Sequence, residues 1–339
     1  METAHRGKQS FEFLHRPAII SYASVAGKKE SQGPLADSFD ITSQDTTFGQ
    51  KSWEKAETQM QKQVFELALQ KAGIKQEQID AAFMGDLLNQ CVGSSFSMRN
   101  NGVPTFGLYG ACSTMAESLL LAGMSIAGGF CRKVLALTSS HFASSERQYR
   151  FPLGYGGQRT PTAQWTVTGA GAVILDREGK GPYLHSGTVG TIVDMGIKDA
   201  NNMGAAMAPA AFATLRTHLD DMNLCPEDYD LIVTGDLGKL GRQIVADLFA
   251  EEGVALGSRY QDCGMMIFDL LRQDVHCGGS GCGCSASVLC GHLLDKLRHK
   301  EITKLLFCGT GALLSPLTTQ QGESVPAVCH AVSIWAERS

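Results

Sequence analysis

The chain has 339 residues, which is enough for two domains of ordinary size or for one large two-part core. Its composition is typical of a globular protein, with 43% hydrophobic and 19% charged residues. A formal net charge of −5 excludes sequence-wide attraction to nucleic acid or to an anionic bilayer, although it allows a local basic patch.

The predicted elements alternate between helices and strands, which favours α/β architecture. The region after Met1 lacks the apolar core of a secretory signal, so we expect the eleven cysteines to be reduced thiols. The polar N-terminal tail and residues 26–40 are expected to be flexible. An amphipathic helix is predicted from Ser52 to Ala72, where Gly73 ends it. Buried strands are predicted within residues 79–90, 133–142 and 169–176.

The apolar run from Leu119 to Phe130 is shorter than a membrane span requires. We therefore expect a soluble protein whose contact with any membrane is peripheral. A helix that is apolar nearly all round is instead expected to lie buried between layers of the fold.

Two pairs of segments repeat along the chain. Residues 65–87 and 212–237 each read as a helix, a polar link and a strand that ends in Gly-Asp-Leu, with Asp86 and Asp236 in the two triplets. Cys112 and Cys284 each lie in a turn of small residues, followed at nearly equal spacing by a lysine and a strand. The pattern predicts a duplicated α/β unit with halves at residues 1–179 and 180–339.

Cys112 lies in the turn Tyr-Gly-Ala-Cys-Ser-Thr, directly before an apolar helix. Thr114 and Glu117 fit a capping box, which places the start of the helix at Thr114. The positive end of the helix dipole would then lower the pKa of Cys112 and favour a thiolate. The alternative is that Cys112 is a small buried residue without reactivity, and taken alone this is the commoner situation for a free cysteine.

Several motifs resemble the thiolase superfamily, which includes thiolases and ketoacyl carrier-protein synthases: the turn at 110–114, the strands at 134–142 and 166–175, and the turn at 308–316. Longer strings at 53–61, 107–119, 141–175 and 233–241 are similar to the stage V sporulation protein AD family of spore-forming bacteria. The resemblance covers most of the chain and implies a thiolase-like five-layered αβαβα fold and a homodimer.

The same resemblance implies a function. It suggests a protein that binds dipicolinic acid and supports its uptake into the developing spore. It also implies a peripheral location at the forespore or spore inner membrane, with other proteins of the stage V sporulation A operon as partners. No cofactor and no nucleic acid are expected.

In the superfamily, a nucleophilic cysteine works with histidine or asparagine partners from two turns of the second half. Here the turn at 233–241 offers Asp236, and the turn at 278–287 offers Cys282 and Cys284. An ionised aspartate cannot donate to an oxyanion, and Cys308 near the C-terminal glycine turn is out of register. We therefore expect a protein without catalytic activity. An acyltransferase or condensing enzyme using Cys112 on a thioester remains the alternative, and a scaffold with an empty pocket is a third.

A metal site formed by His276, Cys277, Cys282 and Cys284 is a further possibility. The spacing C-x4-C-x-C lacks the C-x2-C pairs of most zinc sites. Small residues packed in a tight turn explain the sequence better, and we expect no metal.

A dicarboxylate such as dipicolinic acid needs cationic donors for its carboxylates and a flat surface for its ring. The segment 141–159 offers both. We predict that His141 and Arg150 bind the carboxylates above Cys112, with Arg147, Tyr149 and Arg159 as weaker candidates and Asp236 and Cys284 completing the site. The alternative is an interface loop whose arginines pair with Glu146 or with a partner subunit.

Overall fold

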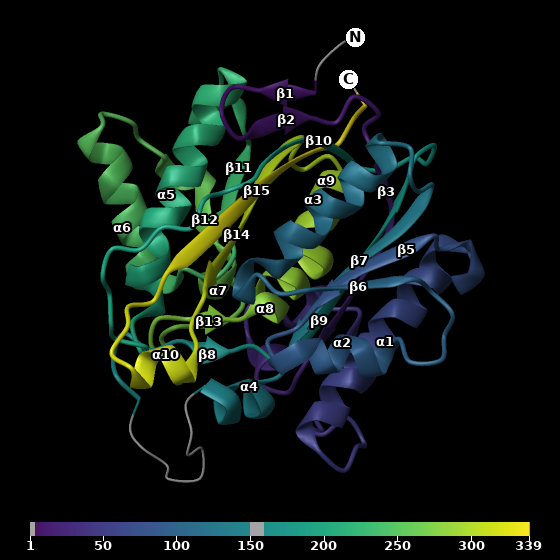
Figure 1. Ribbon diagram of the computed structural model, residues 1–339, viewed down its shortest axis with the longest axis horizontal. Coiled ribbons are helices and arrows are strands. Elements are labelled where there is room, and N and C mark those ends of the chain that lie inside the picture. Colours follow the sequence, from purple (N-terminus) through teal and green to yellow (C-terminus); the bar gives the residue numbers. More distant parts are fainter. Residues whose placement is uncertain (1–3, 150–158, 339) are drawn as a thin grey trace.

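The computed structural model describes residues 4–149 and 159–338, and its strands form two similar halves (Figure 1). The first half contains β3 (Ala18–Ala26), β5 (Ala81–Gly85), β6 (Thr105–Leu108), β7 (Lys133–Ser140) and β9 (Gly169–Asp176). The second contains β10 (Tyr183–Thr188), β11 (Leu231–Thr234), β12 (Tyr260–Asp262), β14 (Lys304–Ala312) and β15 (Ala327–Trp335). The short strands are β1 (His5–Arg6), β2 (Ser10–Glu12), β4 (Ile41–Thr42), β8 (Trp165–Thr166) and β13 (Gly279–Ser280).

Both halves have the same strand order. From their shared boundary outward, the first half runs β3-β9-β7-β5-β6 and the second β10-β15-β14-β11-β12. Each half therefore repeats the same path through the sheet. The division predicted at residues 179 and 180 falls between β9 and β10. Because β3 and β10 pair at Ala18 and Tyr183, the strands connect across the boundary, and the division into two domains stays a prediction.

The helices form three layers around these strands (Figure 1). The inner helices are α3 (Thr114–Ala127), α8 (Cys282–Val288) and α9 (Leu294–Arg298). The outer helices are α1 (Trp53–Ala72) and α2 (Val92–Ser97) on one side, and α5 (Met203–Met222) and α6 (Gly238–Glu251) on the other. Three further short helices are α4 (Phe142–Tyr149), α7 (Cys263–Met266) and α10 (Pro316–Gln320).

Alternating side chains divide the interior into layers. In β7, Val134 and Ala136 face the inner core with α3, while Leu135 and Leu137 face the core under α1. Since successive side chains of a strand point to opposite faces, a sheet covered on both faces needs apolar residues at consecutive positions. The inner helices lie between the two halves of the sheet, which confirms the predicted five-layered αβαβα fold.

The predicted helix at residues 52–72 is confirmed as α1. The Ser52 side chain accepts a hydrogen bond from the Lys55 N–H at 3.3 Å, and Gly73 adopts a φ of 66° after the last turn. These are the expected start and stop signals, because a serine oxygen satisfies a free helix donor and glycine adopts the left-handed conformation without strain.

Residues 26–40 are not the flexible segment that we predict from their polar composition. Glu30 is buried, and its carboxylate accepts a hydrogen bond from the Thr168 N–H at 3.0 Å. Leu35 and Phe39 join the inner core. These few apolar and buried contacts hold a segment whose other side chains are mostly polar. Within residues 4–149 and 159–338, no helix has both the length and the apolar character needed to cross a bilayer.

Replacing Leu119 by alanine tests the inner layer. Leu119 is fully buried between the sheet halves, so the substitution leaves a cavity and should lower the free energy of unfolding by about 2–5 kcal/mol. The measurement is denaturant unfolding followed by circular dichroism. Leu271→Ala is the control, because Leu271 is 97% exposed. Equal losses in the two variants would contradict a packed inner layer.

Candidate functional site

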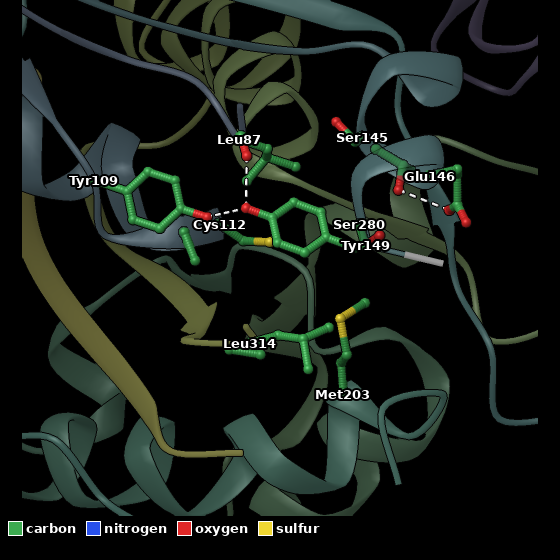
Figure 2. Close-up of a pocket in the computed structure, with 12 residues that line it drawn as sticks. Leu87, Tyr109, Cys112, Ser145, Glu146, Tyr149, Met203, Ser280 and Leu314 are labelled. Atoms are coloured by element: carbon green, nitrogen blue, oxygen red, sulfur yellow. Dashed lines mark hydrogen bonds between the residues drawn. The ribbon is translucent and has the colours of Figure 1, made fainter. Parts of the chain in front are cut away.

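A pocket opens at Cys112, where the first turn of α3 meets the loops at the ends of several strands (Figure 2). Its empty volume is about 440 Å³, open solvent at the mouth included. Both halves of the chain contribute to its wall. The lining residues are Leu87, Tyr109, Ala111, Cys112, Ser145, Glu146, Tyr149, Thr166, Met203, Ser280, Ala312 and Leu314.

The turn before α3 fixes the position of Cys112. Ala111 adopts a φ of 51°, and the Ser113 hydroxyl donates to the Gly110 carbonyl at 2.7 Å. The Thr114 hydroxyl donates to the Ala111 carbonyl at 2.7 Å and accepts from the Gly110 N–H at 3.1 Å. These bonds hold the sulfur at the pocket floor with little freedom to move.

The helix α3 begins at Thr114 as predicted, but the predicted capping box is wrong. Ser113 occupies the N-cap position of the helix, but its side chain makes no hydrogen bond to the N–H groups of the first turn. Glu117 does not close the box, and burial raises the pKa of its carboxyl. The Thr114 hydroxyl is already used inside the turn, so it cannot bond the helix N–H groups.

Cys112 is not the thiolate that the helix dipole predicts. The side chain is 6% exposed, and burial raises the pKa of the Cys112 thiol well above its usual value. The nearby Asp236 carboxyl raises this pKa further, because a second negative charge beside it is unfavourable. Desolvation and this charge outweigh the helix dipole, so the thiol stays neutral.

Asp236, which follows β11, occupies the donors around the thiol. Its carboxyl accepts hydrogen bonds from the Gly281 N–H and the Thr310 hydroxyl, both at 2.8 Å, and the Cys112 thiol also donates to it. Burial raises the pKa of Asp236 to about 7. The N–H of Gly281 could otherwise stabilise negative charge on a substrate oxygen, so here the protein's own carboxyl takes that place.

The cysteines of the turn at 278–287 are structural. Cys282 is fully buried, and its thiol donates to the Ser139 carbonyl at 3.0 Å. Cys284 is fully buried beside the Gly235 carbonyl and does not line the pocket. Burial raises the pKa of both thiols well above the usual value. Cys308 lies in the outer core under α5, away from Cys112.

Two tyrosines stand at the pocket mouth (Figure 2). The Tyr149 hydroxyl donates to the Leu87 carbonyl at 2.6 Å, and the Tyr109 hydroxyl meets the Tyr149 hydroxyl. Tyr109 is 43% exposed, whereas Tyr149 is partly buried. Their rings give the pocket an aromatic wall above Cys112. Tyr149 is a predicted site residue, and Tyr109 is one that sequence reasoning missed although it directly precedes the cysteine turn.

His141 lies outside the pocket. Its Nε2 hydrogen-bonds the Thr46 carbonyl at 2.8 Å, and its Nδ1 accepts from the Ala143 N–H at 3.2 Å. Burial lowers the pKa of His141, so the ring is neutral. A neutral, buried imidazole with both nitrogens engaged is poorly suited to bind a carboxylate.

Two of the three arginines predicted for the site, Arg147 and Arg159, lie outside the pocket. Arg147 forms an ion pair with Glu54 and lies over the Trp53 ring, 5.3 Å from its centroid. The Arg159 guanidinium donates to the Gln164 carbonyl and lies 4.8 Å from the Trp165 ring centroid. Neither lines the Cys112 pocket. Arg150 lies outside the described residues.

The described wall of the pocket is mostly apolar and aromatic. Its one charged member is Glu146, whose carboxylate accepts from the Thr166 hydroxyl at 2.9 Å. Met203 and Leu314, from the second half of the chain, complete the wall opposite the tyrosines (Figure 2). Sequence reasoning missed these two residues, because nothing local in the sequence marks them.

The predicted metal candidates do not gather into a site. His276 pairs with Asp274 at 3.4 Å, and the Cys277 thiol donates to the Pro161 carbonyl. Among the residues that the structure describes, no group of three or more histidine, cysteine, aspartate or glutamate side chains could hold a metal ion.

Comparison with known proteins identifies relatives of the chain. A family model described as stage V sporulation protein AD matches residues 7–335. The chain is 43% identical over 326 residues to stage V sporulation protein AD of Bacillus subtilis (strain 168), and the match covers 96% of both chains.

Solved structures of condensing enzymes share the fold. For 3-oxoacyl-[acyl-carrier-protein] synthase III from Aquifex aeolicus VF5, the TM-score is 0.56 at 15% identity, covering 94% of this chain and 99% of that one. For cerulenin-bound OleA from Xanthomonas campestris, the TM-score is 0.57 at 14% identity, covering 94% and 96%. At these identities the likeness establishes the thiolase-like fold alone.

Asp236→Asn tests whether the Asp236 carboxyl raises the pKa of the Cys112 thiol. Removing this charge should lower the pKa of Cys112 and raise its rate of alkylation by iodoacetamide at mildly alkaline pH about tenfold, the equivalent of one pKa unit. Peptide mass spectrometry over a pH series measures Cys112 separately from the other thiols. The control is Asp262→Asn, since Asp262 is also buried but accepts from the N–H groups of Leu237 and Gly238. An unchanged rate in Asp236→Asn would contradict this role.

Proposed function

The chain belongs to the stage V sporulation protein AD family, and on that basis we propose that it is a non-catalytic protein that binds dipicolinic acid. In this role it supports uptake of the molecule into the developing spore. We further propose that it acts at the forespore or spore inner membrane as a peripheral protein, together with other proteins of the stage V sporulation A operon. The support for these partners is the family resemblance.

The contact between Cys112 and Asp236 carries the non-catalytic part of the proposal. Acyl transfer by a cysteine needs a thiolate and free donors for the oxygen of the thioester. Here the thiol is neutral and donates to Asp236, which also occupies the Gly281 N–H. A pocket of this kind can hold a ligand above Cys112 without reacting with it.

The aromatic wall supports a flat ligand. The rings of Tyr109 and Tyr149 and the apolar side chains of Met203 and Leu314 match the faces of a pyridine ring. Phenol hydroxyls can turn to donate to a carboxylate once the ring of the ligand displaces their present contact.

The carboxylates require a cation that the described wall lacks. Glu146 would repel them, so we place them away from its side chain. Arg150, directly after Tyr149 in the sequence, is the proposed partner, because a guanidinium binds a carboxylate through two parallel hydrogen bonds. His141 is not part of the proposed binding site, since it is neutral and lies outside the pocket.

We also propose a homodimer formed through β6. Among the described strands, β6 pairs only with β5 and so presents a free edge. Phe106 on this strand is 57% exposed and stacks on Phe83 with ring centroids 5.0 Å apart. An exposed strand edge with an aromatic side chain favours pairing with the same strand of a second copy.

Calorimetric titration with dipicolinic acid tests the ligand. The intact chain should bind, and Arg150→Ala should weaken binding at least tenfold, because a carboxylate loses its charged partner. Tyr149→Phe should weaken it several-fold. Arg216→Ala is the matched control, because Arg216 pairs with Asp220 and Glu252 on the surface of α5. Absence of binding by the intact chain would overturn the proposal, and a stable acyl adduct on Cys112 after incubation with acetyl-coenzyme A would favour an acyltransferase.

Light scattering after gel filtration tests the dimer. The intact chain should elute with twice the 36.3 kDa mass of one chain, and Phe106→Asp should elute as a monomer because it places a charge at the strand edge. Leu271→Asp, at an exposed site in the loop after α7, should remain dimeric. An intact chain that elutes as a monomer would rule out this interface.

A further inference from the structure

Three arginines from distant parts of the chain line one surface hollow. Arg16, Arg177 and Arg338 surround an empty volume of about 850 Å³, open solvent included. The Arg338 guanidinium donates to the main-chain carbonyls of Arg16 at 3.2 Å and of Arg177 at 2.8 Å, which holds the three segments together. Across the described ranges 4–149 and 159–338, none of the three forms an ion pair with a carboxylate. Glu178, which also lines the hollow, pairs instead with Arg132 at 3.1 Å.

Exposed apolar side chains lie beside these arginines. Phe130, in the turn after α3, is 87% exposed. This turn adjoins the hollow, because the Arg177 N–H donates to the Arg132 carbonyl at 3.0 Å and Gly129 approaches the Arg177 guanidinium. Leu14, which lines the hollow, is also exposed.

At this surface, three arginines that form no ion pair with the described residues lie beside exposed apolar side chains. A single exposed hydrophobic side chain is ordinary, and the whole chain carries a net charge of −5. Here the exposed side chain of Phe130 lies in a turn that adjoins Arg177. Guanidinium groups bind phosphates, and an aromatic ring beside them gains free energy by entering the boundary between headgroups and acyl chains.

A bilayer fits both features better than a free anion does. A soluble phosphate would use the arginines but would leave Phe130 and Leu14 in water. An anionic phospholipid surface attracts basic side chains and buries apolar ones in the same contact.

We propose that this basic–aromatic surface, formed by Leu14, Arg16, Phe130, Arg132, Arg177 and Arg338, docks on an anionic phospholipid bilayer. The inference rests on the membrane association proposed above and does not depend on the ligand. The strand β2, which precedes Leu14, and the C-terminal end of β15, which precedes Arg338, lie at the top of Figure 1, whereas α4, which lines the pocket, lies at the bottom. A docked protein would therefore hold its pocket away from the lipid, facing water.

Sedimentation with phospholipid vesicles tests the surface. The intact chain should bind vesicles that contain phosphatidylglycerol and should not bind vesicles of phosphatidylcholine alone. Replacing Arg16, Arg177 and Arg338 together by alanine should weaken binding about a hundredfold, given about 1 kcal/mol for each basic side chain near an anionic surface. Phe130→Ser should weaken it about tenfold, because the ring no longer enters the bilayer. The charge-matched control replaces three exposed lysines by alanine, Lys51 just before α1 and Lys55 and Lys62 within it, and should bind as the intact chain does.

The outcomes separate this inference from the others. An intact chain that binds neither kind of vesicle overturns this surface, but not a membrane association made through partner proteins. Equal losses in the arginine and lysine variants overturn the surface alone. An unchanged affinity in Phe130→Ser, with inorganic phosphate displacing the protein, would assign the hollow to a free phosphate and overturn the bilayer. Titration of the arginine variant with dipicolinic acid shows whether its pocket still folds, because ligand binding does not involve this surface.

Discussion

The close approach of backbone to backbone beneath Cys112 is the constraint on which the site depends. The turn before α3 packs directly on β14, where a Cβ at Gly311 would lie 2.4 Å from the Gly110 carbonyl oxygen. On the other side, a Cβ at Gly283 would lie 2.6 Å from the Ser140 nitrogen. Only glycine allows the inner helices to start this close to both halves of the sheet. The same closeness removes water from Cys112 and Asp236, so the packing of the fold also sets the protonation of the site.

Local patterns predicted the parts of this arrangement that local interactions decide. The helix at α1, the strand at β9 and the repeat of the two halves follow from periodicity, capping residues and small-residue turns. The start of α3 is predicted correctly, although the capping box that predicts it does not form. The protonation of Cys112 does not follow, because it depends on burial by segments more than a hundred residues away. The position of His141 outside the pocket does not follow either, since its sequence neighbours cannot show that the Thr46 carbonyl occupies one ring nitrogen. Met203 and Leu314 reach the pocket only through the tertiary fold.

The duplicated halves differ where they meet at the site. Asp86 and Asp236 follow corresponding strands, yet they accept hydrogen bonds from different parts of the fold. Asp86 accepts hydrogen bonds from Ser94 and from the Leu88 N–H within its own half, whereas Asp236 reaches the turn that opens α8 and the thiol of the other half. One copy of the repeated aspartate therefore stabilises a local turn, and the other joins the halves. The pocket exists because the second arrangement brings residues of both halves around Cys112.

The two tyrosines at the pocket mouth bear on how fast a bound molecule could leave. The Tyr149 hydroxyl bonds the Leu87 carbonyl, and the Tyr109 hydroxyl contacts the Tyr149 hydroxyl. At least one of these contacts must break before either ring can rotate away from the mouth. A molecule bound behind these rings would leave at a rate that depends on breaking these contacts as well as on its affinity. Two proteins of this fold with equal affinity could thus differ in residence time through these two side chains alone. The length of time for which this pocket holds a molecule could therefore change without any change in the residues beneath it.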